Sequence, residues 1–231
     1  MTGKKWPALA ALTLLLVLFL SACGSDTNVD PPGNLPDTRL NLEDCSKSAA
    51  STFTTAASTT TSQATVSASG ARIDPPPGTH IYISSTFPYA LALPDGWEVK
   101  EGQSQGNIKG DLFIVKKGDN SGAYVTVIAE DQTGQENSQA FFERKYKEAT
   151  AASKLVFDRQ PERTVGGVTA YVLAFNTPSG QNFSYPVQSI QLLFVGQNRG
   201  WGVTFTASPN QAVQYCPLFA RMLDSFTFTG K

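Results

Sequence analysis

The amino-acid sequence predicts an α+β fold in which helices pack on an antiparallel β-sheet. Three observations lead to this prediction. Short apolar segments separated by tight-turn sequences recur from about residue 81 onward, a pattern typical of β-hairpins. Two stretches repeat apolar residues every three to four positions, as amphipathic helices do. The strands come in runs and do not alternate one by one with helices, so a parallel sheet is not expected.

The first strands lie on either side of a turn at Pro94-Asp95-Gly96. The segment 89–93 alternates before this turn, and Trp97 resumes β structure after it. Residues 102–110 contain three glycines and are expected to form a flexible loop. Two apolar strands joined by a glycine-rich hairpin loop follow, at 111–116 and 123–129.

A helix is predicted after these strands. Asn137 or Ser138 can cap it, because a side-chain oxygen at that position accepts a hydrogen bond from a free backbone N–H. Phe142, Tyr146 and Ala149 then form an apolar stripe on one side of the helix.

The second half of the domain is predicted to consist of two hairpins, a helix and a last strand. The expected strands are 155–160, 169–175, 187–195, 201–207 and 226–228. Paired glycines, Gly166 and Gly167, make the first turn because they permit positive φ. Ser208 can cap the helix with Pro209 at its first position. Pro217 is expected to break this helix, because proline is poorly tolerated in a helix interior.

The amino-terminal 23 residues have the order of a secretion signal. Lys4 and Lys5 give a positive start, an apolar run covers 8–20, and two small residues precede a cysteine in Leu20-Ser21-Ala22-Cys23. This ending resembles the lipobox of bacterial lipoproteins. The resemblance implies that a diacylglyceryl group is added to the Cys23 thiol and that the signal peptide 1–22 is removed. It also implies attachment to the cell membrane on its extracytoplasmic face.

Two alternatives to lipidation remain open for this segment. The run could be an uncleaved membrane anchor, although its length of about 13 residues falls short of the roughly 20 that a spanning helix needs. It could also be an ordinary secretion signal with a chance cysteine. A diacylglyceryl group carries two acyl chains, and two chains are needed for stable anchoring.

Residues 23–80 are predicted to be a disordered tether, and 81–231 the folded domain. Ser, Thr and Ala dominate 46–69, and the segment closes on the proline run 74–78. Such a composition buries too little apolar surface to offset chain ordering. A plain spacer and an O-glycosylated stalk both fit it.

Charge and cysteine content limit the partners and the compartment. Without residues 1–22 the chain keeps 16 of its 18 basic residues and all 19 acidic ones, a net charge near −3, which argues against a nucleic-acid partner. With Cys23 used by the lipid, Cys45 and Cys216 remain as a pair. In an exported chain they can form a disulfide; alternatively Cys45 is a free thiol and Cys216 a buried apolar residue.

Three segments taken in order resemble one known family. They are the aromatic strand and Pro-Asp-Gly-Trp turn of 87–97, the Val-Gly-Gly-Val hairpin of 165–171, and the Ser-Phe ending of 218–226. They are similar to the opening, middle and end of PsbP-like domains, over residues 81–229. The resemblance implies an α/β/α sandwich, a central antiparallel sheet with helices on both faces. The family includes a photosystem II extrinsic subunit, Ran-binding relatives and bacterial envelope lipoproteins of unassigned function. Their shared theme is protein binding, and the matched motifs are structural.

The sequence offers no set of residues for catalysis, and no cofactor or metal is expected. His80 is the only histidine and is expected to be a solvated residue at the start of the domain, since no Cys/His cluster accompanies it. Glu130-Asp131 is interpreted as a solvated strand end. The loop 117–122 lacks the acidic spacing of a calcium site.

Aromatic residues are the one suggestive class. Phe183 and Tyr185 lie in a polar loop, where aromatic side chains often anchor a partner protein. The alternative is that they fold over the sheet edge. The sequence therefore predicts a non-catalytic lipoprotein that binds another envelope protein. The second hypothesis is a carrier for a small apolar ligand, lipid or glycan, which would need an enclosed pocket.

Overall fold

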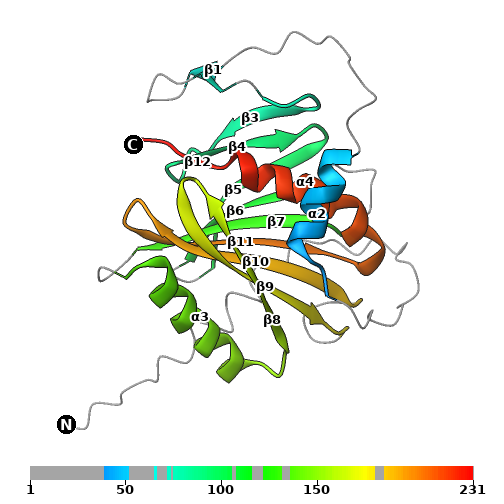
Figure 1. The fold of residues 1–231 in the computed structure, drawn as a ribbon. Helices are drawn as coiled ribbons and strands as arrows, with labels where there is room; N and C mark the ends of the chain where they lie inside the picture. Colours follow the sequence, from blue (N-terminus) through cyan, green and yellow to red (C-terminus); the bar gives the residue numbers. More distant parts are fainter. Residues whose placement is uncertain are drawn as a thin grey trace, which may run out of the picture.

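The computed structural model describes residues 39–51, 65–66, 72–73, 75–105, 108–115, 122–131, 136–179 and 185–230. The elements in chain order are α2 (Leu42–Ser51), β1 (Thr65–Val66), β2 (Arg72–Ile73), β3 (Thr79–Ile83), β4 (Tyr89–Pro94), β5 (Trp97–Gln105), β6 (Ile108–Val115), β7 (Tyr124–Asp131), α3 (Ser138–Ala152), β8 (Phe157–Val165), β9 (Val168–Thr177), β10 (Val187–Gly196), β11 (Arg199–Ala207), α4 (Pro209–Ser225) and β12 (Thr227–Phe228). Figure 1 shows their arrangement.

A seven-stranded sheet forms the centre of the fold, in the order β5-β6-β7-β11-β10-β9-β8, and every neighbouring pair is antiparallel. The β8–β9 turn lies at the paired glycines, as the sequence indicates. Gly166 and Gly167 take φ of 58° and 82° between β8 and β9, and Gln197 and Asn198 take 51° and 57° between β10 and β11. Two successive positive-φ residues are the signature of a type I′ turn.

Helices cover both faces of this sheet, as predicted. On one face α3 packs on β9 and β10, where Phe141 and Phe142 contact Leu173 and Leu193. On the other face α4 packs on β10 and β11, α2 lies against α4, and the small sheet β12-β4-β3 joins them (Figure 1). The fold is therefore α+β with an antiparallel sheet between helical layers.

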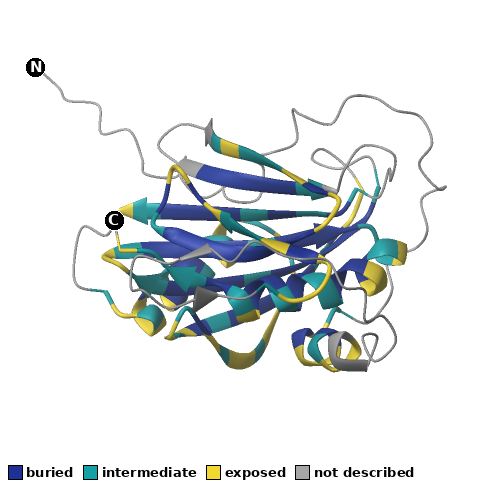
Figure 2. Cartoon of the chain, turned by 90° about the horizontal axis from the view of Figure 1, so that it is seen from above, coloured by how far each residue is buried: buried dark blue, intermediate teal, exposed yellow. Residues whose placement is uncertain are grey.

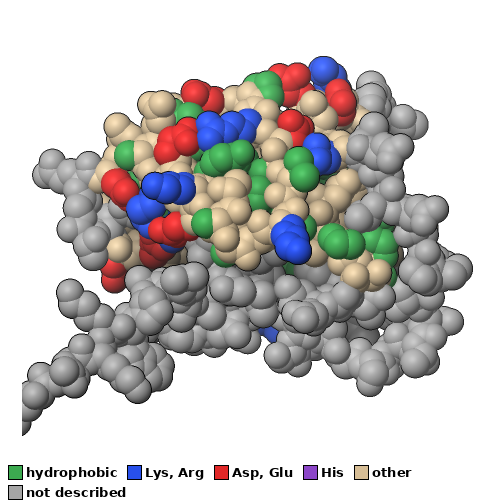
Figure 3. Space-filling view, turned by 90° about the horizontal axis from the view of Figure 1, so that it is seen from below, with side chains coloured by type: hydrophobic (Ala, Val, Ile, Leu, Met, Phe, Trp, Pro, Cys, Tyr) green, Lys and Arg blue, Asp and Glu red, His purple; other side chains and the backbone are tan. Residues whose placement is uncertain are grey.

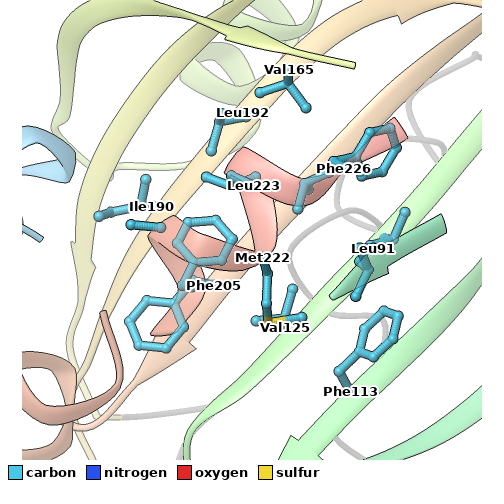
Figure 4. Packing of buried hydrophobic residues seen from close by; sticks show 14 of the residues in the cluster. Leu91, Phe113, Val125, Val165, Ile190, Leu192, Phe205, Met222, Leu223 and Phe226 are labelled. Atoms are coloured by element: carbon cyan, nitrogen blue, oxygen red, sulfur yellow. The ribbon is translucent and has the colours of Figure 1, made fainter. Parts of the chain in front are cut away.

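The main core lies between the large sheet and α4. Leu223 lies toward Ile190 and Leu192 of the sheet, and Met222 lies toward Val125 and Phe205 (Figure 4). Trp97 and Trp201 are also buried. Buried residues follow the strands through the interior, and exposed ones gather at turns and on outer helix surfaces (Figure 2). Each apolar residue removed from water in this way contributes to holding the helices on the sheet.

Two predictions about local structure are wrong. Residues 102–110 are expected as a loop, but β5 and β6 continue through most of this range, and Gly102 at φ 60° sits where the register shifts between Lys100 and Gln103. A glycine in a β-bulge bends a strand without ending it. Pro217 does not break α4 either, because Cys216 and Phe219 are buried on either side of it and packing outweighs one lost backbone bond.

The expected tether 23–80 is partly structured. Leu42–Ser51 forms α2, Thr65–Val66 pairs with Arg72–Ile73, and β3 begins at Thr79 instead of residue 81. Residues 42–51 fold despite their polar composition, because Leu42 and Cys45 bury their side chains against the domain rather than within the segment itself. In the ranges that the structure describes, no helix is both long and apolar enough to span a membrane.

Candidate interaction sites

The structure describes only some of the site residues that the sequence predicted. Leu20, Ser21, Ala22, Cys23 and Phe183 lie outside the described residues. Tyr185 is half-buried, and its hydroxyl lies so close to Gly122 that a Cβ atom there would overlap it. Since Gly122 also has a φ of 60°, a glycine is required at this point. Tyr185 thus folds over the end of the sheet beside the start of β7, with part of its surface still accessible.

Cys45 and Cys216 form a disulfide in the structure, with a Cα–Cα distance of 5.3 Å. It joins α2 to α4 across a sequence separation of 171 residues. Cys45 is 6% exposed and Cys216 is 1% exposed, so the disulfide is shielded from solvent. Disulfides form and persist in oxidising compartments.

Polar contacts to strand β8 hold the start of α2. Gln160 uses both ends of its amide: Nε2 donates to the Leu40 carbonyl at 2.5 Å, and Oε1 accepts from the Leu42 N–H at 3.0 Å. Arg163 donates to Ser46 Oγ at 2.7 Å and also pairs with Asp224 of α4. Therefore both the hydrogen bonds and the disulfide hold the amino-terminal half of α2, from residue 40 to residue 46.

On the opposite face an arginine lies over aromatic rings. The Arg159 guanidinium is 4.1 Å from the ring centroid of Tyr146 and 5.1 Å from that of Phe142. Phe157 packs edge-on against Tyr146, and Tyr171 stacks on Phe142. We call the half-buried or exposed members, Tyr146, Phe157, Arg159 and Tyr171, the arginine–aromatic patch.

The guanidinium in this patch is held in place. Arg159 makes a bidentate pair with Glu143 of α3, with N–O distances of 2.7 and 2.9 Å. Hydrogen bonding from Arg159 lowers the pKa of Glu143 below its ordinary value. The Arg159 side chain nevertheless remains 47% exposed, and the neighbouring Val156 is 65% exposed. In Figure 3, which views the molecule from below, charged and hydrophobic side chains lie side by side on the surface.

A second charged cluster joins α3 to the end of β7. Lys145, only 8% exposed, donates to Glu130 at 2.6 Å, and Arg144 pairs with Glu130 and Glu136 at 2.9 Å each. Hydrogen bonding from Arg144 lowers the pKa of Glu136. The expectation of a solvated strand end thus holds for exposed Asp131 but is wrong for Glu130, which the two cations neutralise. These ion pairs attach α3 to the sheet.

A hollow beside this cluster is too small for a ligand. It has a volume of about 10 Å³ and is lined by Ile128, Phe141, Lys145, Leu193 and neighbouring backbone. Such a volume holds about one water molecule, whereas small-molecule pockets measure some 300–1,000 Å³. This hollow therefore gives the carrier hypothesis no support.

A buried carboxylate, Asp111, is the polar feature that sequence reasoning missed. Its oxygens accept hydrogen bonds from Ser84 Oγ at 2.6 Å, Tyr89 Oη at 2.7 Å and the Gly102 N–H at 2.9 Å. Burial, and then the Asp111 charge, raise the pKa of Tyr89 well above its ordinary value. The sequence did contain one indication of this buried carboxylate, since Asp111 is the one acidic residue in the otherwise apolar start of the predicted strand 111–116. The network fixes the β5 bulge to β4.

Two further expectations concern metals and histidine. Among the described residues, no group of three or more His, Cys, Asp or Glu side chains could hold a metal ion. His80 is exposed, with Nδ1 3.3 Å from Asp95 Oδ1. It lies at the surface near the start of β3, in the kind of position that the sequence suggested.

Comparison with known proteins finds likeness in structure only. No protein-family model and no curated protein matches the chain. Cyanobacterial PsbP (CyanoP) from Synechocystis sp. PCC 6803 is similar with a TM-score of 0.46 and 13% identity, over 65% of this chain and 92% of that chain. LpqN, involved in cell envelope biogenesis of Mycobacterium tuberculosis, is similar with a TM-score of 0.43 and 14% identity, over 67% and 87%. The Saccharomyces cerevisiae Ran-binding protein Mog1p has a TM-score of 0.43 and 9% identity, over 65% and 95%. All three likenesses have TM-scores below 0.5 and identities of 14% or less, so they assign no function to this chain.

Proposed function

We propose that the chain is a lipid-anchored, extracytoplasmic protein whose domain is a non-catalytic binding module for another envelope protein. The observation that carries the binding role is the arginine–aromatic patch. Tyrosine and arginine dominate the binding energy of protein interfaces. In this patch Glu143 and Tyr146 already hold Arg159 in one geometry, so a partner meets an ordered surface and less side-chain entropy is lost on binding.

The charge of the patch indicates the chemistry of the partner. Glu143 neutralises Arg159, so that the patch presents a paired guanidinium beside partly exposed aromatic rings and no free positive charge. Phosphate groups of nucleic acids or anionic lipids would find no unpaired cation in this pair. We therefore expect a protein segment that places apolar side chains against Tyr146, Phe157 and Tyr171.

Two features support the proposed location. The Leu20-Ser21-Ala22-Cys23 sequence resembles a lipobox, and the Cys45–Cys216 disulfide suits an oxidising compartment outside the cytoplasm. Replacing the acceptor thiol by Cys23→Ser tests the anchor. The wild-type protein should carry the mass of a diacylglyceryl group that the Cys23→Ser variant lacks, and a wild-type protein without that mass would refute lipid anchoring.

Site-specific photo-crosslinking in the full-length protein tests the binding role. A photoreactive residue replaces Val156, which is 65% exposed beside the patch, or, as a matched control, Val213, which is 76% exposed on α4. We expect one protein adduct from position 156 that position 213 does not give. Adding Arg159→Ala and Tyr146→Ala should abolish the adduct while the melting temperature shows a folded domain.

The same experiment can refute the proposal. An adduct of equal yield from both positions would mean contact by chance encounter. An adduct from position 156 that survives the loss of Arg159 and Tyr146 side chains would place binding elsewhere, for instance at Phe183 and Tyr185. Tyr185→Ala would then be the next variant to measure.

A further inference from the structure

We infer that helix α2 and its disulfide link the domain to the membrane, and that an intact segment 52–78 is not needed for this attachment. The inference rests on the proposed lipidation of Cys23. In the linear sequence the lipid and the first strand of the domain, β3, are separated by residues 24–78. The disulfide offers a second covalent route, from Cys23 to Cys45 and then directly to Cys216 in α4.

The contacts of α2 show that this route is the shorter one. The chain is already fixed to the domain at Leu40, whose carbonyl accepts from Gln160, and again at Cys45. Between Cys23 and Leu40 the fully extended chain spans at most about 60 Å, against about 190 Å between Cys23 and Thr79. The pinned helix therefore keeps the domain close to the membrane.

The disulfide is needed because α2 is not self-sufficient. The helix has 10 residues, and isolated helices of fewer than about 12 to 15 residues are marginal in water. Leu42 and Cys45 are its buried side chains within the part whose burial is described, and both face the domain. Noncovalent contacts position α2, and the covalent bond makes the attachment permanent.

A consequence is that cutting the chain between α2 and β3 should not release the domain. The two fragments, one with the lipid and one with residues of the sheet, remain joined through Cys45 and Cys216. Release by a cut in this segment therefore also requires loss of the disulfide. This makes the anchored protein resistant to shedding by proteases that attack segment 52–78.

The test uses the full-length protein in membranes. A site-specific protease sequence is inserted after Ala57, between α2 and β1, or after Asn28, between Cys23 and α2, as a control for release. After digestion, cleavage at Ala57 should leave the domain in the membrane pellet, and cleavage at Asn28 should release it. A denaturing gel without reductant should show the fragments cut at Ala57 as one species, and with reductant as two.

The double variant Cys45→Ser/Cys216→Ser gives the decisive comparison. It should lose the domain from the pellet on cleavage at Ala57. Release of the domain from the disulfide-bonded protein, or its retention in the double variant, would overturn the inference. Failure of lipidation is distinguishable: mass spectrometry of the undigested protein would then find no diacylglyceryl group on Cys23, while the gel would still report whether the fragments are linked.

Discussion

The docking of α2 can be loosened by one substitution, Gln160→Ala. Gln160 makes two hydrogen bonds to the backbone of residues 40 and 42, at 2.5 and 3.0 Å. Each hydrogen bond contributes about 1 kcal/mol net, so the variant should lower the free energy of opening α2 by about 2 kcal/mol. Since 1.4 kcal/mol corresponds to a factor of ten, exchange of α2 amide protons through local opening should rise about thirtyfold.

Hydrogen–deuterium exchange of the disulfide-bonded protein measures this effect. The increase should be confined to the first turns of α2, while the strands of the large sheet keep their protection. Gln191→Ala is the matched control, because Gln191 donates to Thr204 Oγ1 at 3.1 Å on β11, away from α2. Unchanged exchange in α2, or an equal rise in both variants, would refute the view that Gln160 holds this helix.

Three further substitutions test other parts of the structure. Arg144→Gln removes the hydrogen bond that lowers the Glu136 pKa. A carboxylate with a lowered pKa stabilises the folded state above its unfolded-state pKa and loses that effect as the pH falls, so the stability gap to wild type should be largest at pH 7 and shrink below about pH 4 in urea unfolding. Tyr89→Phe removes a buried 2.7 Å hydrogen bond to Asp111 and should cost about 2 kcal/mol in the same assay; a cost near zero would mean that the network is not held by this bond. Pro217→Ala restores a helix hydrogen bond in α4 and should stabilise the domain by about 3 kcal/mol. Unfolding at the same or at lower urea than wild type would contradict this prediction.

Local signals predicted the sheet well. The paired glycines 166 and 167 give the β8–β9 turn, and the alternation of Tyr89–Leu93 becomes the buried strand β4. Asn137 caps α3 by accepting from the Ala140 N–H at 2.9 Å, as its position suggested. Such features depend on residues near each other in the chain, and so a single sequence contains them.

The sequence was a poor guide to local structure wherever residues far apart in the chain determine it. A polar segment around Cys45 becomes helical because α4 covers two of its side chains, and no local pattern shows that cover. Gly102 bends β5 instead of ending it because Asp111, nine residues away, accepts its N–H. The arginine–aromatic patch was missed for the same reason, since Tyr146 and Arg159 meet only after α3 packs on the sheet.

The patch is the central claim, and a binding measurement tests it most directly. Once position 156 has identified the crosslinked partner, its dissociation constant is measured against the wild-type domain and against Arg159→Lys, which keeps the charge but loses the planar bidentate contact. We predict at least about tenfold weaker binding for Arg159→Lys, the effect of losing a residue that dominates the interface. Binding within about twofold of wild type would contradict the assignment of this patch as the partner site.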